Sequence, residues 1–116
     1  MKRVILALLL LLPVSGQGVI MTFYIGSELL GSCEAYLDGN YGKGNSCADY
    51  VMGIYDAHDT FVTWGDIKPR WCPPKKMESK QLVRVVTEWL QGNPDKVHFG
   101  ASGLVRTALM QAFPCP

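Results

Sequence analysis

The sequence lacks the patterns that identify several common classes of protein. It has no glycine-rich phosphate loop and no dinucleotide-binding fingerprint. Its 11 basic residues stand against 10 acidic ones, and no basic run is dense enough to hold nucleic acid. The four cysteines include no Cys-x-x-Cys pair, which argues against a zinc site. Internal repeats and alternating strand patterns are also absent, so 116 residues predict one small all-α domain.

The N-terminal residues have the composition of an export signal. Two basic residues precede an unbroken apolar run at 4–12, and small residues follow at the positions that a signal peptidase recognises. We therefore expect a signal peptide at 1–16, cleaved after Gly16, then a linker at 17–25 and a folded domain at 26–116. An uncleaved membrane anchor stays an alternative, because a second apolar stretch follows the small residues.

Four segments have the apolar spacing of amphipathic helices. They cover residues 27–38, 47–60, 77–91 and 97–113, and the third is the clearest because charged residues line its opposite face. Mostly short turns separate these segments, which favours antiparallel neighbours. We expect a small, four-helix, bundle-like single domain in which the helices run up, down, up and down.

Helix ends and loops are also predicted from local sequence. Ser27 and Ser46 are the expected N-caps of the first two helices. Between those helices, GNYGKGNS at 39–46 holds three glycines and two asparagines and predicts a flexible turn. Three prolines at 60–74 predict a long ordered loop, with room for a short extended piece at 60–64.

The even number of cysteines in a small exported domain predicts two disulfide bonds. In an up-and-down bundle, Cys33 and Cys47 lie near one end, while Cys72 and Cys115 lie near the other. Bridged Cα atoms must approach within about 7 Å, so Cys33–Cys47 and Cys72–Cys115 are favoured among the three possible pairings. By chain entropy these bonds contribute about 3 and about 4 kcal/mol.

Candidate catalytic and metal-binding groups are few. The run Asp-Ala-His-Asp at 56–59 places two carboxylates beside His58, but adjacent residues on a helix project in different directions. The surroundings of Ser102 resemble a nucleophile elbow, yet Leu104 stands where that turn requires glycine. We therefore expect no catalytic residue, no metal, no cofactor and no small-molecule substrate.

The loop at 60–74 holds the best candidates for contact with a protein. Trp and Arg are favoured anchors in protein interfaces, and the loop contains both. The alternative is that its Trp rings cover the open end of a small core. The residues that we expect to contact a partner are Trp64, Asp66, Lys68 and Arg70.

Short sequence blocks follow one another in a specific order between residues 26 and 115. They are Gly26-Ser27-Glu28-Leu29-Leu30 before Cys33, Cys47-Ala48-Asp49-Tyr50-Val51-Met52-Gly53, Trp71-Cys72-Pro73-Pro74, Gln81-Leu82-Val83-Arg84-Val85-Val86 with Trp89-Leu90 and Asn93-Pro94, then Ala101, Leu104-Val105, Ala108-Leu109 and Phe113-Pro114-Cys115. In this order the blocks resemble the Rap/Tai immunity proteins. Gly92-Asn93-Pro94 departs from the His-Pro pair that relatives often carry.

The resemblance implies a small, exported helical protein that acts in the periplasm of a bacterium. It implies a non-enzymatic inhibitor that binds and occludes a peptidoglycan amidase effector of type VI secretion. The matched residues belong mainly to the core, the cysteines and the helix ends, so the resemblance predicts the fold better than it predicts the contact surface. A homodimer stays open. Two other functions also stay open: a structural or chaperone-like helical module with no toxin partner, and, as the third reading, an enzyme.

Overall fold

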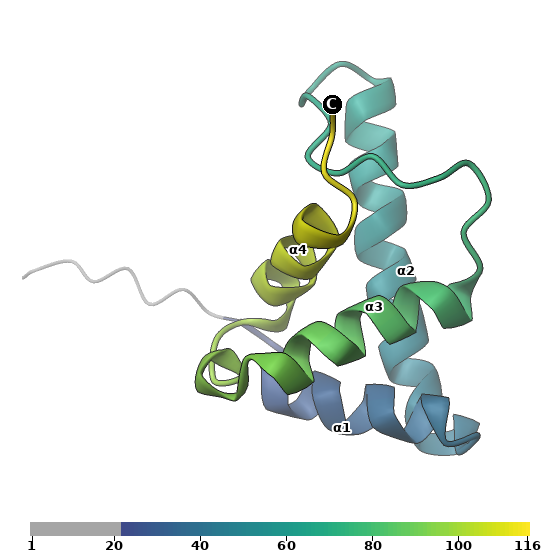
Figure 1. The fold of residues 1–116 in the computed structure, drawn as a ribbon, viewed down its shortest axis with the longest axis vertical. Helices are drawn as coiled ribbons and strands as arrows, with labels where there is room; N and C mark the ends of the chain where they lie inside the picture. Colours follow the sequence, from purple (N-terminus) through teal and green to yellow (C-terminus); the bar gives the residue numbers. More distant parts are fainter. Residues whose placement is uncertain (1–21) are drawn as a thin grey trace, which may run out of the picture.

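Helices form most of the part of the protein that the structure, a computed structural model, describes: residues 22–116. They are α1 (Gly26–Leu37), α2 (Tyr41–Thr63), α3 (Ser79–Gly92) and α4 (Ala101–Ala112), with a short 3-10 helix, η1 (Pro94–Lys96), between the last two (Figure 1). No strand occurs within residues 22–116, which confirms the all-α prediction. The predicted signal peptide and its cleavage site lie outside the described residues.

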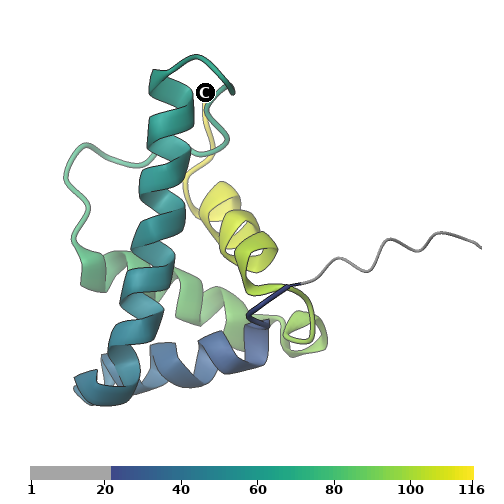
Figure 2. The same ribbon diagram turned by 180° about the vertical axis from the view of Figure 1, so that it is seen from behind.

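The helices cross more steeply than those of a regular up-and-down bundle. In both views α1 and α3 lie side by side at one end of the molecule, and α2 runs across them (Figures 1 and 2). Helix α2 has 23 residues and α1 has 12, so only part of α2 packs against α1. The rest of α2 projects beyond α1 and α3 and faces α4 (Figure 2).

The core draws on every helix and contains mainly aliphatic side chains. Thr87 is the buried polar residue among those described, and its hydroxyl donates a 2.7 Å hydrogen bond to the carbonyl of Val83 one turn earlier. The apolar face that the helical periodicity predicts for α4 is buried at Ala101, Leu104, Val105, Ala108 and Leu109, whereas Ala112 at its last turn is exposed. The buried apolar residues are Leu29, Cys33, Cys47, Ala48, Val51, Trp71, Leu82, Val83, Val86, Leu90, Ala101, Leu104, Val105, Ala108 and Leu109.

The connection between α1 and α2 is much shorter than expected. The predicted flexible turn at 39–46 is wrong, because α2 begins at Tyr41, where the Asn40 side chain accepts a hydrogen bond from the Lys43 N–H at 3.4 Å. Gly44 lies inside α2 and against α1: a Cβ at this position would stand 2.3 Å from the Cα of Tyr36. This glycine therefore permits close helix packing and does not provide flexibility.

The predicted N-cap residues of the first two helices have other roles. Ile25 precedes α1, and its N–H donates a 3.1 Å hydrogen bond to the Glu28 carboxylate, so Ser27 is not the cap. Since α2 begins earlier than expected, Ser46 lies within it, and its hydroxyl is 2.6 Å from that of Ser32 on α1. The two serines thus join the helices beside their disulfide bond.

The other boundaries shift by a few residues. The helix expected at 77–91 is α3, which begins two residues later, at Ser79. The helix expected at 97–113 is α4, which begins at Ala101 because its N–H donates a 2.8 Å hydrogen bond to the carbonyl of Tyr24. Gly26 likewise donates to Phe99 at 2.9 Å, so the residues before α1 are held against those before α4.

Both predicted disulfide bonds are confirmed. The Cα atoms of Cys33 and Cys47 are 5.0 Å apart, and those of Cys72 and Cys115 are 4.9 Å apart. The first bond joins α1 to α2 inside the core, and the second fastens the chain after α4 to the segment that follows α2. No helix among residues 22–116 is long and apolar enough to cross a membrane.

Candidate functional site

The projecting end of α2 leads into an exposed loop, residues 64–70, which we call the 64–70 loop. The helix ends in a Schellman motif: the Asp66 N–H bonds to the Phe61 carbonyl at 2.9 Å and the Gly65 N–H to the Val62 carbonyl at 3.0 Å. Gly65 has a φ of +82°, a conformation that glycine adopts at no steric cost. The chain therefore turns sharply at a defined residue.

Helix α2 extends through the residues for which the sequence suggested an extended piece. The extended conformation expected at 60–64 is wrong, because α2 continues to Thr63. The β-prone side chains here continue a helical pattern: Ile54, His58 and Phe61 follow an i, i+4, i+7 spacing and line one groove. The helix thus forms here despite the β propensity of Phe61 and Val62, since local propensity is a weak constraint on a short segment.

The far side of the 64–70 loop is fixed by Trp71 and His58. The Trp71 ring is 4% exposed and stacks on the His58 ring with centroids 3.7 Å apart. The backbone N–H of Arg70 donates a 2.9 Å hydrogen bond to His58 Nε2. This nitrogen must be unprotonated to accept the bond, so the neutral ring carries its proton on Nδ1.

The environment of His58 favours this neutral form. Burial lowers the pKa of His58 from its usual value of 6.5, and the Asp59 carboxylate partly opposes that effect. The histidine therefore positions a loop. Across residues 22–116, no group of three or more His, Cys, Asp or Glu side chains is placed to hold a metal ion.

The structure separates the two tryptophans of the predicted contact region. Trp71 belongs to the core, as the alternative for the loop proposed, whereas Trp64 is 72% exposed at the tip beyond α2. Asp66, Lys68 and Arg70 are exposed as well. Of the four predicted contact residues, Arg70 alone lines a groove; the other three lie on the loop beside it.

A groove of about 360 Å³ lies between α2 and α4, beneath the 64–70 loop, and we call it the α2–α4 groove. Seen from behind, α2 and α4 face each other, and the chain after α2 passes over the end of the space between them (Figure 2). Most of the lining is apolar. The lining residues are Ile54, Ala57, His58, Phe61, Ile67, Arg70, Trp71, Ser102, Gly103 and Arg106.

The charges that line the α2–α4 groove have one sign. Arg70 comes from the loop and Arg106 from α4, and no Asp or Glu is among the lining residues. Asp59 lies beside a neighbouring recess, with Cys72 and Pro73. Within residues 22–116, neither arginine is close enough to a carboxylate to form an ion pair. The groove thus combines an apolar floor with two cationic groups.

Sequence reasoning missed the α4 side of this groove. Gly103 leaves open space on this side, because a Cβ built there meets nothing within 4 Å. Ser102 and Arg106 stand one turn apart on the same side of α4, and both line the groove. The signal available in the sequence was the i, i+4 spacing of Ser102 and Arg106 next to Gly103.

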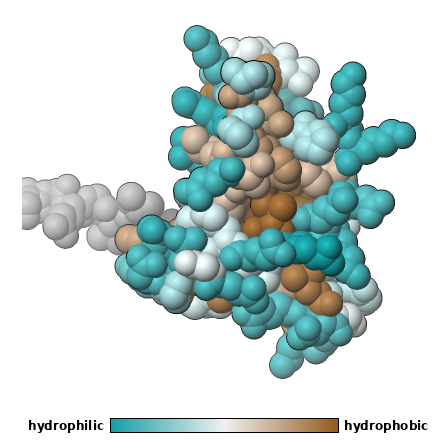
Figure 3. Space-filling view, in the orientation of Figure 1, coloured by the Kyte–Doolittle hydropathy of each residue, from teal (hydrophilic) through white to brown (hydrophobic). Residues whose placement is uncertain are grey.

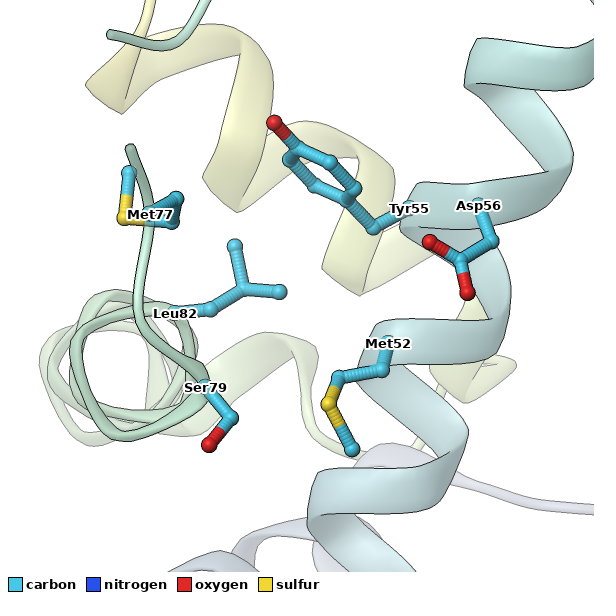
Figure 4. Close-up of a pocket in the computed structure, with 6 residues that line it drawn as sticks. All are labelled: Met52, Tyr55, Asp56, Met77, Ser79 and Leu82. Carbon is cyan, nitrogen blue, oxygen red and sulfur yellow. The ribbon is translucent and has the colours of Figure 1, made fainter. Parts of the chain in front are cut away.

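A smaller recess of about 160 Å³ lies between α2 and the start of α3 (Figure 4). Leu82 points into it from α3, and Asp56 lies at its edge on α2 (Figure 4). Its polar groups are the Asp56 carboxylate and the hydroxyls of Tyr55 and Ser79. Burial and the nearby carboxylates raise the pKa of Tyr55, which makes its hydroxyl a poor proton donor at neutral pH. We interpret this recess as imperfect packing below the long connection to α3.

A third recess opens on the face shown in Figure 3. Apolar surface is visible near the middle of this face, with hydrophilic side chains around it (Figure 3). The recess measures about 290 Å³ and is bounded by Pro74, Lys76, Met77, Gln81, Val85 and Phe113. Its position, between α3 and the chain after α4, separates it from the 64–70 loop, so it adds nothing to that surface.

Comparison with protein families gives one result that covers nearly the whole described chain. The family model of the Rap1a immunity proteins matches residues 25–115. The match includes all four helices and both disulfide bonds. Comparisons with curated proteins and with solved structures give no match. A model that covers this much of the chain identifies its family and indicates a role in immunity against a secreted effector: the chain belongs to the Rap1a immunity proteins.

Proposed function

We propose that this protein is a periplasmic immunity protein that binds a type VI secretion peptidoglycan amidase and blocks its substrate cleft. Membership of the Rap1a immunity proteins supports the immunity role. The two disulfide bonds support export, because such bonds persist in oxidising compartments outside the cytoplasm. The amidase as the target follows from the resemblance of the sequence to the Rap/Tai immunity proteins.

The 64–70 loop is the observation that carries the proposal. It is exposed, yet it is fixed at both ends: the Schellman motif defines its start, and the stacked Trp71 and the disulfide bond of Cys72 define its end. A fixed loop loses little conformational freedom when it binds, which favours affinity. Its tip presents Trp64, a residue type that is enriched among the side chains that dominate binding energy.

An inhibitor that acts by occlusion needs a protruding, preorganised element more than it needs reactive groups. The described residues whose pKa is shifted, His58 and Tyr55, lie on the part of α2 that leads to the 64–70 loop, where His58 positions the loop. Burial raises the pKa of Tyr55, and the carboxylates of Asp59 and Asp56 raise it further, so that hydroxyl stays protonated at neutral pH. These groups support a binding surface and suggest no catalytic pair.

The test is inhibition of a purified amidase, chosen from the gene next to that of this protein, acting on isolated peptidoglycan. The wild-type protein should inhibit hydrolysis at a 1:1 ratio, and Trp64→Ala should weaken binding by roughly 30-fold or more, as for an interface anchor worth about 2 kcal/mol. Trp89→Phe is the control, because Trp89 lies on α3 and bonds to Gln111 of α4, away from the loop.

The fold must be checked in the same experiment. Trp64 is largely solvent-exposed, so Trp64→Ala should unfold at nearly the wild-type temperature. Failure of the wild-type protein to bind or inhibit the amidase would contradict the proposal. In that case, capture of unfolded envelope proteins would instead support the chaperone-like alternative.

A further inference from the structure

The residues that line the α2–α4 groove restrict the chemistry of a bound ligand more than the residues of the exposed 64–70 loop do. Its floor is apolar and aromatic, with Phe61 and Ile67 partly exposed at its edge. Its charged groups are two arginines from different elements, without a carboxylate among the lining residues. We propose that this groove binds a short, extended segment of the effector in which an apolar side chain stands beside a carboxylate.

Charge complementarity is the first argument for this occupant. An unpaired guanidinium presents a planar fork of N–H donors that fits a carboxylate with two parallel hydrogen bonds. Arg70 and Arg106 are both available for such contacts, since neither is ion-paired within residues 22–116. A basic segment would place like charges together in a partly enclosed site, which opposes binding.

The shape of the groove is the second argument. Its volume of about 360 Å³ lies near the lower end of the range of roughly 300–1,000 Å³ that is typical of ligand sites. It can hold a few side chains but not a folded domain. Gly103 widens it, because the missing side chain leaves open space on the α4 wall.

Continuity with the 64–70 loop is the third argument. Arg70 and Ile67 belong to the loop and also line the groove, so a segment in the groove contacts the loop as well. A single partner can therefore cover both surfaces at once. The inference rests on the proposed function in this respect: it takes the effector as the partner and specifies which of its segments the groove binds.

The first experiment needs no effector. The ¹⁵N-labelled protein is titrated with acetyl-Glu-Leu-Phe-Glu-amide and, separately, with acetyl-Lys-Leu-Phe-Lys-amide, on the order of 1 mM each, the range expected for short peptides. The acidic peptide should shift the amide signals of Ser102 and Gly103 and bind roughly tenfold more tightly than the basic one. Equal binding of the two peptides, or no shift at these amides, would overturn the proposal.

A third probe tests another class of ligand. Decanoate has a carboxylate and an apolar chain but no peptide backbone. If decanoate shifts the same amides at a lower concentration than the acidic peptide does, the groove is a site for small amphiphiles and the proposal is wrong. If it binds more weakly than the acidic peptide, recognition of a peptide segment is supported.

The second experiment uses the amidase and matched variants. Gly103→Leu fills the groove and should weaken binding at least tenfold. Gly31→Leu is the control, because Gly31 is also an exposed helical glycine with open space around it, but it lies on α1. Arg106→Glu should weaken binding similarly, whereas Arg84→Glu, the same charge change on α3, should not.

The outcomes distinguish this inference from the proposed function. If the amidase binds the wild type but also binds Gly103→Leu and Arg106→Glu equally well, the groove proposal is wrong and the proposed function stands. If the amidase does not bind at all while the acidic peptide still shifts Ser102 and Gly103, the proposed function fails and the recognition chemistry of the groove is retained. Loss of binding in both control variants would show that the effect is unspecific and would overturn the groove proposal.

Discussion

The two disulfide bonds tie together two regions of the molecule that differ in almost every other respect. Cys33 and Cys47 are 0% exposed and lie where α1 and α2 pack closely. Cys72 is exposed, and its bond to Cys115 holds a long connection against the end of the chain. The first bond belongs to a packed core, whereas the second fixes the base of a loop that presents side chains to solvent. The same chemistry thus stabilises a core in one region and preorganises a surface in the other.

The largest effect should come from removing the buried bond. In Cys33→Ala combined with Cys47→Ala, the lost loop closure costs about 3 kcal/mol, and each deleted buried sulfur costs about 1 kcal/mol more. We expect the free energy of unfolding to fall by about 5 kcal/mol in total, measured by urea denaturation under oxidising conditions. If removing this bond lowered the free energy of unfolding less than removing the exposed bond does, burial would not be what distinguishes the contributions of the two bonds.

Removing the exposed bond should have a slightly smaller effect on stability and a more local one on structure. Its closed loop is longer, 43 residues against 14, so chain entropy alone gives about 4 kcal/mol. In Cys72→Ala with Cys115→Ala, we expect hydrogen exchange to rise first at the amides of the 64–70 loop, because its base is released. Uniform acceleration of exchange throughout the core would contradict this separation of roles.

Close packing at the buried end can be tested without changing a cysteine. Gly44→Ala places a Cβ within 2.3 Å of the Tyr36 backbone, so α1 and α2 must move apart. We expect the free energy of unfolding to fall by about 2 kcal/mol, since overpacking typically costs about 1–3 kcal/mol. Gly42→Ala is the control: its Cβ would come no closer than 3.6 Å to another residue, and it should be neutral or stabilising. Equal behaviour of the two variants would refute the role of Gly44.

The smallest effect concerns pH and acts at the exposed end. Because burial lowers the pKa of His58 in the folded protein, the unfolded chain takes up a proton first as the pH falls below about 6.5. Protonation also removes the acceptor of the Arg70 N–H bond. Stability should therefore decrease as the pH falls below about 6.5, the usual pKa of histidine.

The variant His58→Gln has no imidazole to titrate, so its unfolding temperature should depend less on pH over this range. His98→Gln is the matched control, because it replaces the other histidine of the chain, which is exposed and belongs to the segment before α4 and not to the loop. The measurement is the unfolding temperature at a series of pH values. An identical pH dependence in all three proteins would show that His58 does not couple protonation to the loop.

The helices were accessible to prediction because they follow from local rules, and the disulfide pairing was accessible because each cysteine lies near a helix end whose position the helix order predicts. Apolar periodicity places Leu82, Val86 and Leu90 on one face of α3, and all three are buried. The start of α2 was not accessible in this way. Glycine in a helix is normally unfavourable, and the compensation for Gly44 comes from packing against α1, which only the tertiary structure reveals.

The candidate site likewise has one part that the sequence indicated and another that only the tertiary structure reveals. Trp64 and Arg70 were identified from residue type and loop composition, and both are exposed. The groove was not foreseen, because it joins residues from α2, the 64–70 loop and α4 that are up to about 50 positions apart in the chain. The sequence also could not distinguish Trp64 from Trp71, since the difference arises from the stacking of His58 on only one of them.

The pairing of Tyr24 with Ala101 and of Gly26 with Phe99 has a practical consequence for experimental design. It fixes the point where the chain enters the fold at the start of α4, at the end of the molecule away from the 64–70 loop (Figure 1). An affinity tag or a biotin attached ahead of residue 22 therefore leaves the loop and the groove free. A tag after Pro116 would lie beside the loop and the groove, since Cys115 is bonded to Cys72, which is two residues after Arg70. Immobilisation through the amino end is the orientation to use on a biosensor.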